Sequence, residues 1–149
     1  MPKIWQRTPM SPDTEQVAAD FIAYALFDPD DAPDEVFARG WVIYDLVEDD
    51  PTLAWDVIKK VVRGYAEDDL ILGKNPDAQR VVGRLAAGPL EDLLGVQGPQ
   101  FIDIVEAEAR LDRRMAWTLG GVWQNSMPDD IWLRVQRAAA DMLHHWNGG

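Results

Sequence analysis

The stretch that decides the fold runs from residue 50 to residue 65 and reads DPTLAWDVIKKVVRGY. Its apolar side chains recur three and four positions apart, the spacing that places them on one face of an α-helix: Ala54, Val57, Ile58, Val61, Val62 and Tyr65. Asp50 supplies a capping side chain, and Pro51 suits the first helical turn. The stretch therefore predicts an amphipathic helix that packs one face into a core.

The same pattern recurs on both sides of this stretch. Pro, Gly and Asp punctuate it where helices begin or end, and the pattern predicts helices at residues 11–27, 33–47, 75–87, 88–94, 98–110, 113–119 and 128–146. Gly40, inside the segment 33–47, predicts a close helix contact. Strand signals are weak, because no hairpin pattern of alternating residues occurs. We therefore expect one all-α domain over residues 1–149, either an irregular helical bundle or a short HEAT-like α-solenoid of paired antiparallel helices.

The charge of the chain restricts its partners. Fourteen Lys and Arg against 26 Asp and Glu give a net charge of −12, which disfavours binding to nucleic-acid phosphates or anionic lipid. Sixteen of the acidic residues but only six of the basic ones lie within residues 1–72, so the first half is the acidic one. No apolar run reaches the ~18–20 residues of a membrane-spanning helix, and no secretory signal is recognisable. We expect a cytoplasmic protein that binds neither nucleic acid nor membrane, and the sequence leaves its oligomeric state open.

The chain offers little material for metal or cofactor chemistry. Cysteine is absent, which excludes disulfides, thiolate metal sites and a cysteine nucleophile. The pair His144-His145 would point its rings about 100° apart on a helix and could not grip one metal ion. No calcium loop, Gly-rich phosphate loop or serine elbow is recognisable. We therefore predict no metal and no cofactor, and an enzyme is the less favoured class.

The second half carries a set of motifs. Residues 85–94 read LAAGPLEDLL, and they are followed by Phe101-Ile102-Asp103, by Glu106 with Ala109-Arg110, and by Gly120-Gly121-Val122-Trp123. This pattern resembles a family of small bacterial helical proteins of unknown function, over about residues 80–135. The resemblance implies a helical, HEAT-like arrangement and no established activity. The chain thus divides into an acidic half, residues 1–79, and a family-like half, residues 80–149.

One turn departs from the pattern of the family. Where the resemblance implies Asp-Pro-x-Phe, this chain has Asp112-Arg113-Arg114-Met115. The proline that would fix the backbone is therefore missing from this turn.

Two acidic clusters are the predicted contact surface. Acidic residues at a helix start cap amide groups and suit the helix dipole, which accounts for several of them without a function. Others are expected at helix ends, where negative charge opposes the dipole. The candidate partner-binding residues are Glu48, Asp49, Asp50, Glu67, Asp68 and Asp69. They indicate a protein-interaction module with a basic partner, and the most concrete form of this hypothesis is an inhibitor or immunity-type protein that neutralises a basic effector such as a nuclease.

The alternative is a helical enzyme or small-ligand-binding protein. Its pocket would lie near four residues of the second-half motifs, Glu91, Glu106, Arg110 and Trp123. These side chains would have to converge, since reacting groups must lie within hydrogen-bond reach of their partners. Glu106 and Arg110 are also spaced to form an i,i+4 ion pair on the surface of a helix.

Seven tryptophans are a large number for a chain of this length. Most of them fall on or beside the apolar stripes and are predicted to pack in the core, with Trp132 buried on the final helix. Trp5 lies in a polar N-terminal segment and is the one expected to be exposed.

Overall fold

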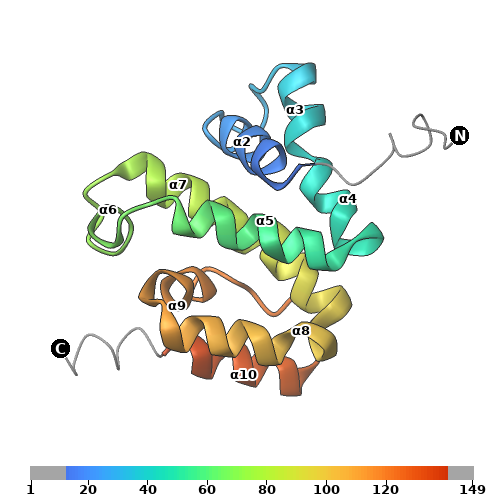
Figure 1. Ribbon diagram of the computed structural model, residues 1–149, viewed down its shortest axis with the longest axis vertical. Helices are drawn as coiled ribbons and strands as arrows, with labels where there is room; N and C mark the ends of the chain where they lie inside the picture. The colour runs from blue at the N-terminus through green and yellow to red at the C-terminus, as the bar shows by residue number, and fades with distance from the viewer. Residues whose placement is uncertain (1–12, 141–149) are drawn as a thin grey trace, which may run out of the picture.

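Figure 1 shows the computed structural model, which describes residues 13–140. The all-α prediction is confirmed, because this part of the chain forms helices and no strand. The elements are α2 (Thr14–Ala25), α3 (Asp34–Gly40), α4 (Val42–Asp49), α5 (Pro51–Arg63), α6 (Glu67–Ile71), α7 (Pro76–Leu85), the π-helical turn η1 (Ala86–Leu90), α8 (Glu91–Leu111), α9 (Arg113–Leu119) and α10 (Asp129–Ala139). The predictions made for Trp5 and for His144-His145 lie outside the described residues.

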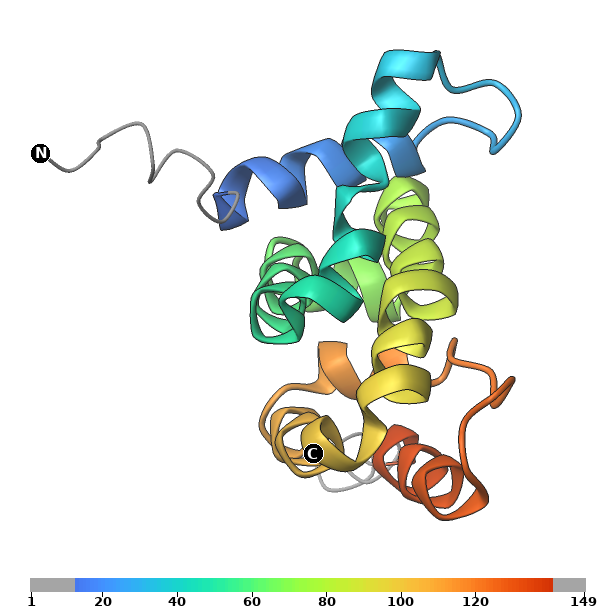
Figure 2. The same ribbon diagram turned by 90° about the vertical axis from the view of Figure 1, so that its right-hand side faces the viewer.

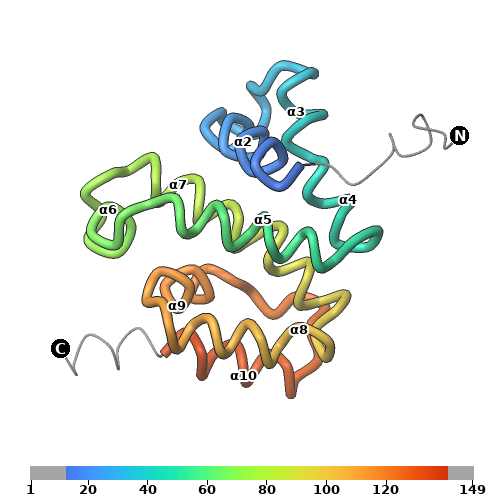
Figure 3. Tube along the Cα trace, viewed as in Figure 1, coloured from blue at the N-terminus to red at the C-terminus, as the bar shows by residue number. Residues whose placement is uncertain are grey.

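The helices lie in three tiers (Figures 1 and 2). One outer tier holds α2 and α3, the middle tier holds α5, α6 and α7, and the other outer tier holds α8, α9 and α10. The tube in Figure 3 shows α4 leading from the first tier to the second. α5 contacts helices of both outer tiers, α2 on one side and α8 and α9 on the other, and it also touches α4 and α7. Within the described ranges, no helix combines the length and the apolar character needed to cross a bilayer.

α5 reaches this central position because its apolar face is wide. Its buried side chains are Ala54, Trp55, Val57, Ile58, Val61 and Val62, so that Trp55 extends the face beyond the predicted stripe. The Asp50 carboxylate accepts the backbone N–H of Leu53 at 3.2 Å, and Pro51 occupies the first turn. The amphipathic helix predicted for this stretch is confirmed, with its last residue at Arg63.

The predicted boundaries were wrong in two other regions, whereas the helix predicted at residues 113–119 is found as α9. The single helix expected over residues 33–47 breaks at Trp41 into α3 and α4. Conversely, the three helices expected between residues 75 and 110 join into a nearly continuous path through α7, η1 and α8. Pro89 lies inside the π-helical turn, whose wider geometry accommodates a residue without a backbone N–H. The path bends at Gln97 (φ −121°, ψ 21°) instead of ending there.

Two arginines tie the middle tier to the tier of α8–α10. Arg63, the last residue of α5, binds both carboxylate oxygens of Glu108 at 2.6–3.0 Å. Arg114, on α9, donates to the carbonyl oxygen of Tyr65 at 2.8 Å and to that of Arg63 at 3.2 Å. Arg114 therefore fixes the segment that follows α5 by binding two of its carbonyl groups from the neighbouring tier.

The turn at Asp112 keeps its capping role without a proline. The Asp112 carboxylate accepts the backbone N–H of Arg114 at 2.9 Å and the guanidinium of the same residue at 2.9 and 2.8 Å. Burial acts to raise the pKa of Asp112, but the hydrogen bonds and the charge of Arg114 outweigh it and lower that pKa below its ordinary value. A side-chain pair thus fixes the turn where the resemblance implied a proline ring.

The tryptophans divide between core and surface. Trp55 is buried, and Trp117 is half-buried, whereas the side chain of Trp123 is 73% exposed. Trp132, which was predicted on the apolar stripe of the final helix, is half-buried and packs against the core. The buried stripe of α10 runs through Ile131, Val135 and Ala138, and Trp132 lies beside that stripe.

The close contact predicted at Gly40 is confirmed and yields a stability test. A Cβ at this position would overlap the Cβ and Cγ of Tyr24 on α2. Gly40→Ala should therefore lower the free energy of unfolding by about 1–3 kcal/mol, although alanine is the better helix former. Gly83→Ala on α7 is the matched control, since no atom lies within 4 Å of its added methyl group. Denaturant unfolding should show a loss for the first variant and a gain of up to ~1 kcal/mol for the second, and equal effects would contradict the contact.

Candidate functional site

The predicted acidic contact residues lie at opposite ends of α5. Glu48, Asp49 and Asp50 form the corner between α4 and α5, whereas Glu67, Asp68 and Asp69 belong to α6. α5 has 13 residues and is therefore about 20 Å long. The two clusters are distinct surfaces, and the structure does not bring the six residues into one patch.

Both clusters were predicted to place acidic residues at the ends of helices. The structure confirms this for Glu48 and Asp49, but the prediction was wrong for Glu67, Asp68 and Asp69. Glu48 and Asp49 are exposed in the last turn of α4, where their charge opposes the helix dipole. The residues of the second cluster instead form the first turn of α6, because the chain breaks at Gly64 and a new helix starts at Glu67.

Several of these carboxylates have partners within the chain. Asp50 caps α5, Glu67 pairs with Arg113 at 2.8 Å, and Asp68 pairs with Lys74 at 3.4 Å. Ion pairs within the chain therefore account for much of the second cluster. Glu48 and Asp49, at the corner between α4 and α5, are the better candidates for contact with a partner.

An aromatic cluster at the junction of α2, α3 and α4 was missed by the sequence analysis. Phe37 stacks on Trp41 with ring centroids 4.9 Å apart and planes at 18°, and Trp41 stacks on Tyr44 at 4.1 Å and 21°. Tyr24 meets both Phe37 and Trp41 edge to face. Phe37 and Trp41 are nevertheless 42% and 38% exposed, so the stack presents aromatic surface to solvent. We call Phe37, Trp41 and Tyr44 the aromatic stack.

In a single helix over residues 33–47, the spacing of three and four predicts that these three rings share the inward face with Val36 and Val47. The rings do not share an inward face in the structure, because the helix breaks beside Gly40 and the spacing of three and four no longer describes one face. The signal that could have found them is the glycine itself, placed directly before a tryptophan in a helical pattern.

Carboxylates surround the aromatic stack along the chain. Between residues 28 and 45 there are six acidic residues and a single basic one, Arg39. The acidic side chains are all exposed: Asp28, Asp30, Asp31, Asp34, Glu35 and Asp45. Two of them have partners, since Arg39 pairs with Glu35 and Arg80 with Asp28. The segment that carries the stack is therefore strongly acidic.

A small cavity of about 210 Å³ lies between the stack and the helix η1, lined in part by Tyr24, Tyr44, Arg84 and Gly88. The hydroxyl of Tyr44 comes so close to Gly88 that a Cβ there would overlap it. Burial, together with the nearby Tyr24 and the charge of Asp92, raises the pKa of Tyr44 to about 12. Tyr44 is thus neutral at physiological pH and fixed by its packing.

Two of the second-half motifs bind one another. Glu91 of LAAGPLEDLL is buried, and its carboxylate accepts the backbone N–H of Trp123 at 3.0 Å and the side-chain amide of Asn125 at 2.9 Å. Gly121 packs against Ala86, where an added Cβ would lie 3.1 Å from the alanine methyl. These contacts hold the loop between α9 and α10 against the start of α8.

The other two residues of the predicted pocket lie elsewhere. Glu106 accepts hydrogen bonds from Arg134 on α10, which also binds Asp103 at 2.5 Å. The predicted pairing of Glu106 with Arg110 was therefore wrong, because the guanidinium of Arg134 on the neighbouring helix takes the carboxylate.

Arg110 and Glu106 line a cavity of about 110 Å³. Fifteen positions separate Glu91 from Glu106 along α8, about 22 Å at the rise of an α-helix. The four residues Glu91, Glu106, Arg110 and Trp123 thus occupy two separate places and do not converge on one pocket. Among residues 13–140, no group of three His, Asp or Glu side chains is arranged to hold a metal ion.

Together these features define an all-α helical bundle with an exposed aromatic surface in an acidic region. The chain belongs to a family of unknown function (DUF6869), whose family model matches residues 29–143. No curated protein and no solved structure matches the chain. The match begins well before residue 80, where the resemblance had placed the start of the family-like half. The family region therefore includes α3, α4 and the aromatic stack.

The contact between the two motifs predicts that the carboxylate of Glu91 stabilises the fold, whereas that of the adjacent Asp92 does not. Glu91→Ala should lower the free energy of unfolding by about 1–3 kcal/mol, because it removes the acceptor of two part-buried donors. Asp92→Asn is the matched control: burial, with the charge of Glu91, raises the pKa of Asp92, so its ionised form is disfavoured in the folded chain.

The control should not lower stability at neutral pH, and its advantage over the parent chain should shrink as the pH falls through the pKa of Asp92. Urea unfolding at several pH values measures both effects. Equal losses from the two substitutions would contradict the structural role of Glu91.

Proposed function

We propose that this protein is a cytoplasmic protein-interaction module, of the inhibitor or immunity type, which binds and neutralises a basic effector. The observation that carries the proposal is the aromatic stack, held in fixed geometry and exposed in a region of negative charge. Aromatic rings are enriched among the residues that dominate binding energy at protein interfaces. Exposed apolar groups of this size, rimmed by polar residues, are typical of interaction sites.

The chemistry of the surface favours an arginine-rich partner. A guanidinium over the face of a tryptophan gains ~0.5–2 kcal/mol, depending on how far it is desolvated. The carboxylates between residues 28 and 45 add charge-assisted hydrogen bonds to the same group. Trp41 would be the central contact, since it stacks on both Phe37 and Tyr44.

The wider charge of the chain supports fast association. A net charge of −12 attracts a cationic surface before contact, and such steering weakens as salt rises. We further propose that the three tiers are a short HEAT-like stack, in which the outer tier of α2 and α3 presents the binding surface. The alternative is an enzyme or small-ligand site at Glu91, Glu106, Arg110 and Trp123. It gains no support, because these four residues lie in two separate places.

Removing the aromatic stack should abolish partner capture without unfolding the protein. The Phe37→Ser/Trp41→Ser variant deletes two exposed rings, and Leu111→Ser is the control because Leu111 is 83% exposed on α8. The immobilised chain should capture a basic protein from a lysate of its own organism at low salt, and capture should fall as salt rises. It should fall at least tenfold in the double variant and persist in the control, with circular dichroism reporting the fold of each. Capture that survives both the substitutions and high salt would contradict the proposal.

The two acidic clusters provide a second comparison with the captured partner. Glu48→Lys/Asp49→Lys changes the corner that follows α4, the helix that carries Tyr44, whereas Asp68→Lys/Asp69→Lys changes the far end of α5. The first pair should lower the association rate more than the second, because steering acts most strongly on charges near the contact. A larger decrease in the association rate from the second pair would contradict this surface and indicate that the partner binds at α6.

A further inference from the structure

The cavity of about 210 Å³ between the aromatic stack and η1 is lined by groups that select a ligand by charge and shape. The rings of Phe21, Tyr24 and Tyr44 form aromatic walls. Arg84 on α7 is the one charged side chain among the described residues that line the cavity. Ala87 is an exposed part of the lining, so a small molecule can reach the cavity from solvent.

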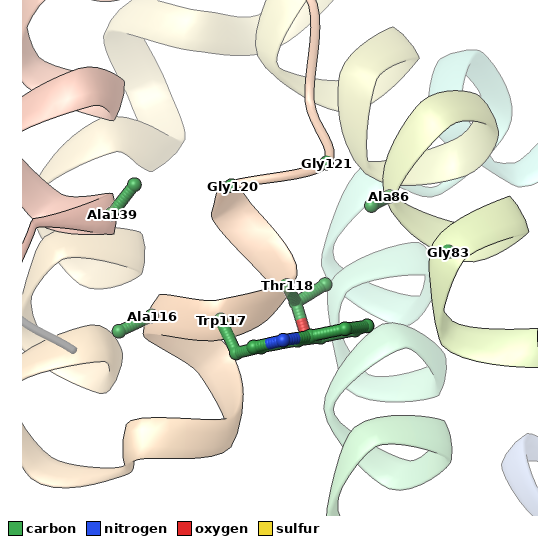
Figure 4. Close-up of a pocket in the computed structure, with 8 residues that line it drawn as sticks. All are labelled: Gly83, Ala86, Ala116, Trp117, Thr118, Gly120, Gly121 and Ala139. Atoms are coloured by element: carbon green, nitrogen blue, oxygen red, sulfur yellow. The ribbon is translucent and has the colours of Figure 1, made fainter. Parts of the chain in front are cut away.

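A larger pocket of about 340 Å³ lies between α7, α9 and the end of α10 (Figure 4). Its walls consist mostly of alanine and glycine around the ring of Trp117, and none of the described residues in these walls carries a charge. A specific site combines apolar walls with a few placed polar groups. The smaller cavity, which has both, is therefore the stronger candidate for a ligand site.

Arg84 retains hydrogen-bonding capacity for a ligand. One of its terminal nitrogens donates to the carbonyl oxygen of Phe27, whereas a guanidinium has five N–H donors. Within residues 13–140 no carboxylate pairs with Arg84, and that of Asp28 pairs instead with Arg80, one turn earlier on α7. The remaining donors suit the two oxygens of a carboxylate.

The hydroxyl of Tyr44 is a second donor beside the cavity. It lies next to Gly88, another lining residue, where an added Cβ would overlap it. None of the described residues accepts a hydrogen bond from this hydroxyl. Since no unpaired polar side-chain atom in this part of the chain is fully buried, the hydroxyl is accessible. Burial raises the pKa of Tyr44 to about 12, so the hydroxyl keeps a proton to donate.

The acidic groups of this region oppose an anionic ligand only weakly, because each is engaged or disfavoured as an ion. Asp28 is neutralised by Arg80. Glu91 accepts two hydrogen bonds from the loop between α9 and α10. Burial, with the charge of Glu91, raises the pKa of Asp92, so its ionised form is disfavoured.

We propose that this cavity binds a small aromatic carboxylate. Arg84 can only donate hydrogen bonds, so the ligand must supply an acceptor, and its carboxylate binds Arg84 and the Tyr44 hydroxyl. The ring of the ligand packs against the aromatic walls. A cavity of about 150 Å³ is enough for a benzene ring, so the 210 Å³ found here holds a ring with one carboxylate.

The test is an NMR titration of the full chain with benzoate and with phenylacetate, which follows the ring signals of Tyr24 and Tyr44. Both probes should shift these signals to saturation. Benzamide, which has no charge, and acetate, which has no ring, should each bind about tenfold more weakly than benzoate.

Substitutions assign the binding to the lining groups. Arg84→Gln should weaken benzoate binding by about tenfold or more, because it removes the charge-assisted hydrogen bonds. Arg80→Gln is the matched control, since it removes the same charge one turn earlier on the same helix, and it should change the dissociation constant by less than about twofold. Circular dichroism reports the fold of each variant.

Two further variants keep the test decisive if Arg84→Gln does not fold. Tyr44→Phe removes only the hydroxyl and should weaken binding by about fivefold. Asp92→Asn should strengthen binding, because the charge of Asp92 acts on Tyr44 and opposes a second carboxylate nearby.

Three results would overturn the proposal. The first is that neither benzoate nor phenylacetate at about 10 mM shifts the signals of Tyr24 and Tyr44. The second is equal affinity for benzoate and benzamide, which would leave the carboxylate without a role. The third is an equal loss of binding in Arg84→Gln and Arg80→Gln, which would assign the effect to net charge alone.

Discussion

The burial of α5 on several sides is the constraint on which the rest of the structure depends. Its apolar face includes Trp55 as well as the predicted stripe, so one neighbouring helix cannot cover it. α2 covers it from one outer tier, α8 and α9 cover it from the other, and α4 and α7 also contact it. The three tiers are thus a consequence of one helix with more apolar surface than a simple pair of helices can bury.

The ends of α5 connect this core to the surface chemistry. At its start, Asp50 caps the helix and leaves Glu48 and Asp49 exposed at the corner with α4. At its end, Arg63 and the carbonyl oxygen of Tyr65 are bound by residues of α8 and α9. The second end is therefore occupied by internal contacts, whereas the first leads through α4 to the aromatic stack. This asymmetry favours the side of α5 that faces α2, α3 and α4 for the proposed contact surface.

The sequence predicted the helical class and the central helix, because periodicity and capping are local properties that α5 obeys throughout. It failed where a neighbour decides the outcome. Gly40, directly before the break at Trp41, packs against Tyr24 of another helix, and Pro89 stays inside a helical path because a π-helical turn accommodates it. The partner of Glu106 is Arg134, twenty-eight positions away, which no i,i+4 rule anticipates. The aromatic stack was missed for the same reason, since its exposure follows from a helix break that local spacing does not reveal.

The most direct test of the proposed contact surface is an NMR titration that follows the indole N–H signals of the tryptophans and the backbone amides. A nona-arginine peptide at low salt serves as the probe, with nona-lysine as the control for charge alone. Nona-arginine should shift the signals of Phe37, Trp41 and Tyr44 first and most strongly. Nona-lysine should shift them less, because an ammonium lacks the planar stacking face of a guanidinium. Equal shifts from both peptides, spread over α6 and the other acidic positions with the signal of Trp41 unmoved, would contradict the proposed surface.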